Sequence, residues 1–329
     1  MKNYQRLILL LFIPLLWVSC ETDFDLNAEW KDITVVYGIL NQNEDTHYIR
    51  IQKAFLGQGN VLQMALEADS NLYPNNLDVV IQEWNDATLV RTLQLDTITI
   101  KDKESGIFFS SNQPLYFREA TLNPNYKYKL VITNLSTNKV ITSECELVGD
   151  FGITTPAANT QINFNIPTNP TKTFAWRPAK NAGRYQMIMR FNYLDVDVGT
   201  NDTIARHIEW FSPIVKSGNT SGGGDIEIRF TNETFFSMVE TQIPKLENII
   251  RYPVNVELIF YVAATDLSTY IEVNEPSSSL VQERPEYTNI ENGLGVFSAR
   301  YDKTSVHRIH FQTINRLMEM DGHNFQWVP

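Results

Sequence analysis

Cysteine is scarce in this chain, which has only Cys20 and Cys145 among its 329 residues. Small secreted domains that depend on disulfides carry many more cysteines, so this sequence is not a disulfide scaffold. Cys145 alternates with polar residues over Thr142–Leu147, which is typical of a strand. We expect a buried structural thiol rather than a nucleophile, because free cysteines are usually buried and only His47 lies in the same half of the chain.

Long apolar runs and positive charge are also scarce. The apolar run Leu7–Leu16 is broken by Pro14 and is shorter than the ~20 residues that a membrane-spanning helix needs. Lysine and arginine total 27 against 38 aspartates and glutamates, for a formal net charge of −11. An acidic surface repels phosphate backbones, so we expect no nucleic-acid partner and no basic membrane-binding patch.

Familiar catalytic motifs are missing as well. Gly222–Gly224 lacks the lysine of a phosphate-binding loop, and Gly218–Gly222 has threonine where a hydrolase elbow has serine. Asp195–Asp202 resembles a calcium loop, but its glycine comes one position early and Arg206 replaces the bidentate glutamate. We expect a solvated hairpin turn there.

Histidines do not cluster in the sequence either. His307 and His310 are three apart, which places them on opposite faces of the strand that we predict for residues 305–311, although a helix would bring them together. The sequence does not decide whether two carboxylates are paired as in a glycosidase, because residues distant in the sequence can lie close together in the fold. We predict no catalytic residues, no cofactor, no metal and no enzymatic activity.

The first 20 residues have the layout of a signal peptide. Lys2 and Arg6 precede the apolar run, and Leu16–Cys20 resembles a bacterial lipobox, although Trp17 stands where leucine is usual. The resemblance implies that residues 1–19 are removed and that Cys20 carries the lipid, palmitate included, which anchors the protein to a membrane. The alternative is an ordinary cleaved signal peptide with Cys20 as an incidental thiol.

The residues after Cys20 are acidic. Glu21, Asp23 and Asp25 resemble the surface-export signal of Bacteroidota lipoproteins, and a plain solvated tether over residues 20–31 is the alternative. The expected location is therefore the outer membrane, at either the cell surface or the periplasmic face. Acylation of the first cysteine would leave Cys145 without an intramolecular partner.

Residues 32–150 have the pattern of an all-β domain. About seven short alternating segments are separated by turn residues, and one helical segment lies at residues 61–68. The spacing predicts a β-sandwich, of either immunoglobulin-like or transthyretin-like strand order. The clearest strands are at residues 32–40, 47–55, 78–84, 126–132 and 140–148.

Residues 172–329 have the pattern of a second β-sandwich with short helices. Residues 151–171, rich in threonine, asparagine and proline, are predicted to be a linker that includes an edge strand at Ile162–Ile166. Residues 254–264 are apolar on alternate positions of both faces, which predicts a central strand covered on both sides. Helices are expected at residues 233–243, 267–275 and 313–320, and a closing hairpin at residues 295–301 and 305–311.

One segment of the second half resembles a fibronectin type III domain. Thr173–Pro178 contains a Trp-x-Pro turn, and Asn181–Phe191 contains a tyrosine that opens the following strand. The resemblance implies paired strands here, with Tyr185 to Tyr193 lining one face at alternate positions. The predicted fold class is mainly β, with two sandwiches and a few short helices.

The layout of the whole chain resembles a family of Bacteroidota outer-membrane lipoproteins known only as a domain of unknown function. The acidic lipoprotein start, Val35–Leu40 and Asn289–Ser298 carry the resemblance. Such proteins are often encoded beside TonB-dependent transporters. The resemblance implies a non-enzymatic accessory protein that binds a ligand or that transporter during nutrient uptake, and the alternative is a structural or adhesive cell-surface protein.

Two threonines lie in possible glycosylation motifs. Thr97 and Thr203 each occur in an Asp-Thr-Ile sequence, which resembles the O-glycosylation motif of exported Bacteroidota proteins. A three-residue motif arises easily by chance, so the alternative is an unmodified threonine in a β-strand at each position.

Overall fold

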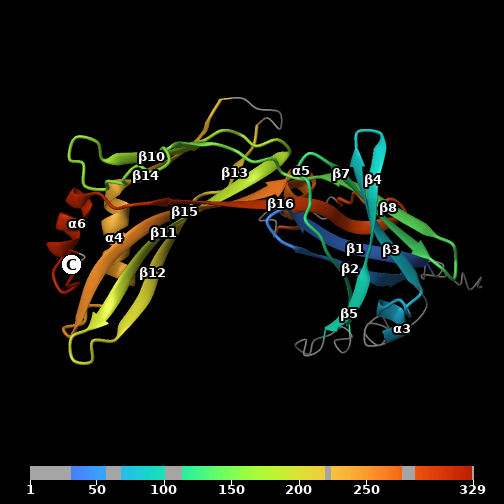
Figure 1. The fold of residues 1–329 in the computed structure, drawn as a ribbon, viewed down its shortest axis with the longest axis horizontal. Helices are drawn as coiled ribbons and strands as arrows, with labels where there is room; N and C mark the ends of the chain where they lie inside the picture. The colour runs from blue at the N-terminus through green and yellow to red at the C-terminus, as the bar shows by residue number, and fades with distance from the viewer. Residues whose placement is uncertain (1–30, 57–67, 101–112, 219–223, 276–285, 328–329) are drawn as a thin grey trace, which may run out of the picture.

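The computed structural model describes residues 31–56, 68–100, 113–218, 224–275 and 286–327. Strands hold 54% of the residues and helices 12%, which confirms the prediction of a mainly β fold built of sandwiched sheets with few short helices. The molecule is an arch with two lobes joined across its top (Figure 1). The first lobe contains β1–β8, and the second contains β9–β15 with α4 and α6.

The largest sheet runs through both lobes. Its neighbouring strands are antiparallel except for one parallel pair, β1 with β16. In spatial order the strands are β12 (Thr203–Phe211), β11 (Ala182–Asp197), β15 (Ile249–Ala264), β16 (Gly293–His307), β1 (Lys31–Asn41), β2 (Thr46–Leu56), β6 (Gln113–Glu119) and β5 (Asp96–Ile100), and β13 (Val215–Lys216) also pairs with β11.

Strand β16 belongs to both lobes. Residues 293–300 pair with β1, and residues 300–307 pair with β15. The predicted closing hairpin is therefore wrong, since this region is one uninterrupted strand. The polar residues at its centre, which we interpreted as a turn, have partners in other parts of the chain. Asp302 accepts a hydrogen bond from Asn41, and Lys303 pairs with Asp150. The last part of the chain thus completes the sheet of the first lobe.

The first lobe is completed by a four-stranded sheet. Alternate residues of its strands, including Tyr128, Leu130 and Ile132, join the same buried core as Val36 and Ile49 of the large sheet. This alternation follows the pattern seen in the sequence. In spatial order the strands are β4 (Thr88–Gln94), β3 (Leu77–Asn85), β7 (Lys127–Asn134) and β8 (Val140–Glu146), and the short helix α3 (Ala68–Asn71) precedes β3. Apart from its last residue, the helix predicted at residues 61–68 lies outside the described residues.

The second lobe packs a three-stranded sheet over the apolar face of β11 and β15. The alternate residues from Tyr185 to Tyr193 are all buried on that face, as predicted. Trp176 meets Phe260 at a ring-centroid distance of 5.0 Å, which joins the two layers. The strands of the smaller sheet are β14 (Ile226–Thr231), β10 (Thr171–Trp176) and β9 (Ile153–Thr155).

The segment that we predicted as a linker is part of this core. Ile162 and Phe164 are fully buried, and Phe164 stacks on Phe235 with ring centroids 4.2 Å apart. Instead of an edge strand, Ile162 forms a single parallel bridge to Ile309. Part of the predicted linker therefore belongs to the core, while residues 157–161 and 167–170 are exposed.

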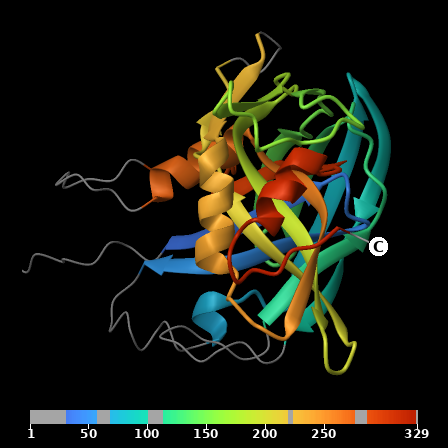
Figure 2. The same cartoon turned by 90° about the vertical axis from the view of Figure 1, so that its left-hand side faces the viewer.

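Three helices match the expected positions to within two residues at either end. They are α4 (Asn232–Gln242), α5 (Thr265–Asn274) and α6 (Phe311–Met318). Thr231 occupies the N-cap position of α4, and the side chain of Asn232, the first helical residue, donates to the Asn169 carbonyl. Helices α4 and α6 close the outer end of the second lobe, whereas α5 lies where the lobes meet (Figures 1 and 2). No helix in the described part of the chain is long and apolar enough to span a membrane.

Candidate functional site

Two cavities flank the point where β15 passes into α5. The larger has a volume of about 630 Å³, and the smaller about 250 Å³. The larger one lies on the face of the nine-stranded sheet opposite the core of the second lobe. The predicted central position of β15 is confirmed, since it lies between β11 and β16, but its second face is covered only in part: Ile259 is buried, whereas Tyr261 is 48% exposed.

The strand register builds the floor of the larger cavity. Two consecutive rows of paired residues on β11, β15 and β16 point to the same side, because directly paired residues share a face of the sheet. The rows are Arg184, Ala263 and Arg300, then Gln186, Tyr261 and Asp302. Neighbouring strands are ~4.8 Å apart, so the two arginine backbones lie roughly 10 Å apart with only the alanine methyl group between them. This small side chain leaves the hollow open.

Helix α5 and the segment after β12 supply the walls. Leu267, Ile271 and Glu275 recur every four residues, so they lie along one side of the helix, and all three line the cavity. Ile214, which is 49% exposed, lines the cavity from the segment after β12. The walls are therefore mainly apolar, with a carboxylate at the end of the helix.

Arg184 is the most buried charged residue of the lining, with 8% of its surface exposed. Its Nε donates to Ser268 Oγ over 3.2 Å, and its Nη1 donates to Glu275 over 2.9 Å. No described residue accepts a hydrogen bond from its Nη2. One edge of this largely buried side chain is thus open to solvent and has no partner among the described residues.

The turn after β1 fixes the opposite side of the cavity. Asn41, which is buried, donates to Asp302 over 2.8 Å, and Arg300 donates to Glu44. The Tyr261 hydroxyl and the Gln186 amide have no hydrogen-bond partner among the described residues. Residues of the first lobe therefore fix the side chains of Asp302 and Arg300, although most of the cavity floor belongs to the second lobe.

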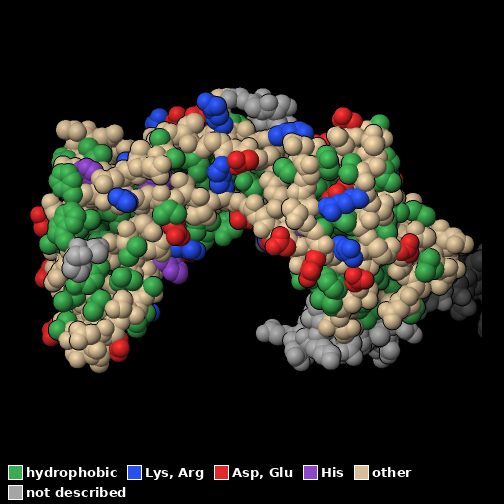
Figure 3. Space-filling view, viewed as in Figure 1, with side chains coloured by type: hydrophobic (Ala, Val, Ile, Leu, Met, Phe, Trp, Pro, Cys, Tyr) green, Lys and Arg blue, Asp and Glu red, His purple; other side chains and the backbone are tan. Residues whose placement is uncertain are grey.

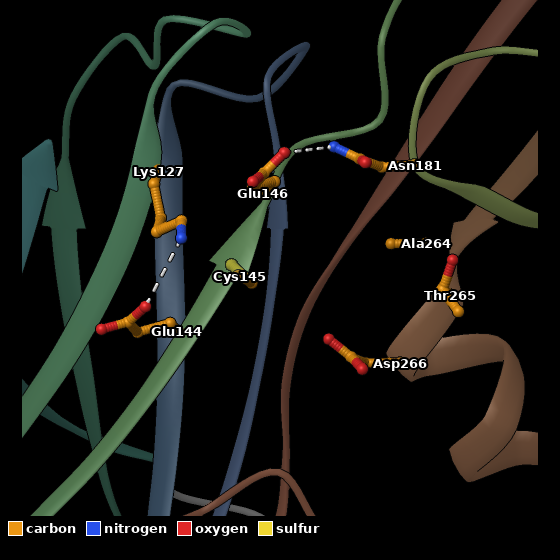
Figure 4. A pocket seen from close by; sticks show the side chains of 8 residues that line it. All are labelled: Lys127, Glu144, Cys145, Glu146, Asn181, Ala264, Thr265 and Asp266. Atoms are coloured by element: carbon orange, nitrogen blue, oxygen red, sulfur yellow. Dashed lines mark hydrogen bonds and ion pairs between the residues drawn. The ribbon is translucent and has the colours of Figure 1, made fainter. Parts of the chain in front are cut away.

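The smaller cavity lies between β8 and the start of α5 (Figure 4). It contains three carboxylates, and each already has a partner. Glu144 pairs with Lys127 at 3.7 Å, Glu146 accepts from Asn181 at 2.9 Å, and Asp266 accepts from the Tyr287 hydroxyl at 2.5 Å. Within the described ranges, no group of three or more histidine, cysteine, aspartate or glutamate side chains is placed to hold a metal ion.

Cys145 lies in β8 at the base of the smaller cavity, and only 5% of it is exposed. The predicted burial is confirmed. Burial raises the pKa of the thiol well above its ordinary value, and the nearby carboxylates of Asp266 and Glu146 raise it further. Both effects disfavour the reactive thiolate.

We therefore expect the Cys145 thiol to be inert in the folded protein. In a Cys20→Ser variant, where it is the sole thiol, iodoacetamide at pH 8 should react roughly 100-fold or more slowly than in urea, because reaction requires local opening. Intact mass spectrometry over time would measure the rate. Rapid labelling of the folded variant would contradict this expectation.

The other sequence-predicted residues are not brought together. Thr97 in β5 and Thr203 in β12 are exposed, but they lie on opposite edge strands of the nine-stranded sheet. Cys20, Glu21, Asp23 and Asp25 lie outside the described residues.

The calcium-loop and histidine candidates have structural roles. Asp195 bonds to the buried Arg251, while Asp197 accepts from two backbone N–H groups of the turn after β11. His307 ends β16, and its Nδ1 contacts the Thr160 carbonyl at 3.0 Å. His310 lies outside the strand that we predicted for it and caps α6, accepting from the backbone of Gln312.

The cavity residues were not singled out from the sequence. Arg184 and Gln186 alternate with buried residues, which marks them as outward-facing, but only the pairing across three strands brings them beside Arg300 and Asp302. A scan of the chain against protein-family models and a search of curated proteins found no match.

Proposed function

We propose that this protein is a lipid-anchored, non-enzymatic accessory protein of the outer membrane that binds a small ligand during nutrient uptake. The observation that carries the proposal is the cavity of about 630 Å³ beside α5. Ligand sites are typically ~300–1,000 Å³, with mainly apolar walls and a few polar groups that converge on the ligand. The cavity has these features.

The chemistry of the lining supports binding rather than catalysis. The described residues that line it include no histidine, cysteine, serine or threonine, so a nucleophile with an adjacent base is not assembled there. Its two carboxylates are engaged: Glu275 accepts from Arg184, and Asp302 accepts from Asn41.

The proposed anchor is Cys20, with residues 20–31 as the tether. Strand β1 begins at Lys31, so a lipid on that tether would hold the first lobe nearest the membrane. Between the lobes the surface is broadly hollowed, which suits a partner that projects into the arch (Figure 3). A TonB-dependent transporter is the partner that we propose.

Filling the cavity should weaken ligand binding. In the full chain carrying Cys20→Ser, we expect Ala263→Phe to weaken binding of the neutral fluorescent probe N-phenyl-1-naphthylamine roughly tenfold or more, which is ~1.4 kcal/mol. The added ring would project between the two arginines into the hollow. Fluorescence titration measures the affinity.

Val254→Phe is the matched control for this variant. Val254 lies on the same strand and is 44% exposed, but it is outside the cavity lining. Its substitution should leave probe binding unchanged. If both variants bind as the parent does, or if the parent binds neither this probe nor an aliphatic ligand, the cavity is not a ligand site.

The proposed anchor has its own test. Cells fed radiolabelled palmitate should label the wild-type protein but not Cys20→Ala, because the thiol is the acylation site. Crosslinking followed by purification should recover an outer-membrane transporter with the wild type. Equal labelling of the two proteins would exclude acylation at Cys20.

A further inference from the structure

The polar groups of the larger cavity offer more hydrogen-bond donors than acceptors. Within the described ranges the Nη2 of Arg184 has no hydrogen-bond partner, although the side chain is only 10% exposed. The Tyr261 hydroxyl and Gln186 amide are likewise without partners in the described part of the chain, and Arg300 uses one nitrogen on Glu44. The acceptors Glu275 and Asp302 are each already engaged.

Leaving a buried donor without an acceptor destabilises a complex, and more so when the donor is charged. Water can satisfy such a group in the empty cavity, but an apolar ligand that displaced the water would leave it unsatisfied. An occupant that fits must therefore bring an acceptor to the edge of Arg184 that has no partner among the described residues.

We propose that the ligand of this cavity is an organic monocarboxylate with an apolar body, an inference that rests on the proposed function. The carboxylate binds between Arg184 and Arg300, above Ala263, where planar guanidinium groups match its two oxygens. Tyr261 and Gln186, in the next row, donate to the same group or to a polar atom beside it.

The charges of the lining limit how much negative charge a ligand can bring. Arg184 and Arg300 are balanced by Glu275 and Asp302, so the lining is formally neutral, and Glu44, which pairs with Arg300, adds a carboxylate beside it. A doubly charged phosphate would carry more charge into the cavity, close to those two carboxylates, than one carboxylate does. A cation would find both carboxylates engaged and two arginines beside it.

The apolar body of the ligand has a defined place. Leu267 and Ile271 of α5 face the cavity on one side, Ile214 reaches it from the segment after β12, and Tyr261 offers an exposed ring on the floor. These surfaces lie beside the arginine row, so a chain or ring attached to the carboxylate is covered while its charge stays between the guanidinium groups.

Three ligands that differ only in their head group test the inference. Octanoate, octanol and octylamine are titrated calorimetrically into the full chain carrying Cys20→Ser. We expect octanoate to bind roughly tenfold or more tightly than octanol, as one charge-assisted hydrogen bond allows, and octylamine to bind most weakly. Arg300→Gln should reduce the octanoate affinity by this factor and the octanol affinity much less, and Val254→Phe, which lies outside the lining, is the control that should change neither.

The outcomes separate the two proposals. Equal affinity for octanoate and octanol, or preference for octylamine, would overturn the carboxylate inference and leave the ligand site standing. Failure of all three ligands and of the neutral naphthylamine would overturn the ligand site itself. The salt dependence of binding to the parent protein is a further test, which does not require any variant to fold. Added NaCl should weaken octanoate binding more than octanol binding, because salt screens charge interactions. Identical salt dependence of the two ligands would contradict the inference.

Discussion

Replacing Gly295 with alanine is expected to destabilise the protein by about 4 kcal/mol or more, among the largest effects of any single substitution. Gly295 has a φ of +106°, and a Cβ built there would lie 2.0 Å from the Val36 carbonyl oxygen. That oxygen belongs to β1, which is paired with β16 at this position, so the backbone cannot move away without breaking the parallel pairing. Only glycine accepts this conformation without steric cost.

Gly152→Ala is the matched control for this experiment. A Cβ at Gly152 meets no heavy atom within 4 Å, and we expect a change within ~0.5 kcal/mol. Urea unfolding followed by circular dichroism gives the free energy of unfolding of each variant. A loss below ~1 kcal/mol for Gly295→Ala would mean that the β1–β16 contact yields easily and is not a fixed junction between the lobes.

Replacing Arg251 with methionine is expected to cost about 3–5 kcal/mol, the range measured when one partner of a buried ion pair is removed. Arg251 is fully buried and makes three hydrogen bonds in three directions. Its Nε donates to Asp195 over 2.9 Å, and its Nη1 and Nη2 donate to the carbonyls of His323 and Pro244, each over 2.8 Å. The substitution would leave the carboxylate and both carbonyls short of a donor.

Arg206→Met provides the comparison, because Arg206 lies 3.5 Å from the other oxygen of the same Asp195. The Arg206 side chain is 54% exposed, so its ion pair is screened by water and should contribute less than ~1 kcal/mol. The same urea unfolding measurements apply. Equal losses in the two variants would show that burial of Arg251 adds nothing to its ion pair.

Local sequence pattern was sufficient for much of the fold. Helices α4, α5 and α6 were found to within two residues, because apolar residues recur at helical spacing and few other features compete there. The face of β11 from Tyr185 to Tyr193 was found for the corresponding reason, an alternation over nine residues that only Ile188 interrupts. The burial of Cys145 also followed from its place in an alternating strand.

The long-range pairings were not accessible in this way. Asp302–Thr304 has the composition of a turn, and only the partners Asn41 and Asp150, more than 150 residues earlier, explain why the strand continues through it. The cavity depends on the register of β11, β15 and β16, which a single sequence does not specify at a distance. Its lining residues are ordinary outward-facing positions until that register is known.

The shared strand also constrains the order in which the chain can fold. One of the two neighbours of β1 is supplied by residues 293–300, which are synthesised some 260 positions after it. The first lobe cannot complete its sheet until those residues are present, and contacts of such sequence separation form slowly. Until then, the unpaired edge of β1 is open to pairing with the strands of other chains. Correct folding should therefore depend on another molecule, such as a chaperone, covering that edge.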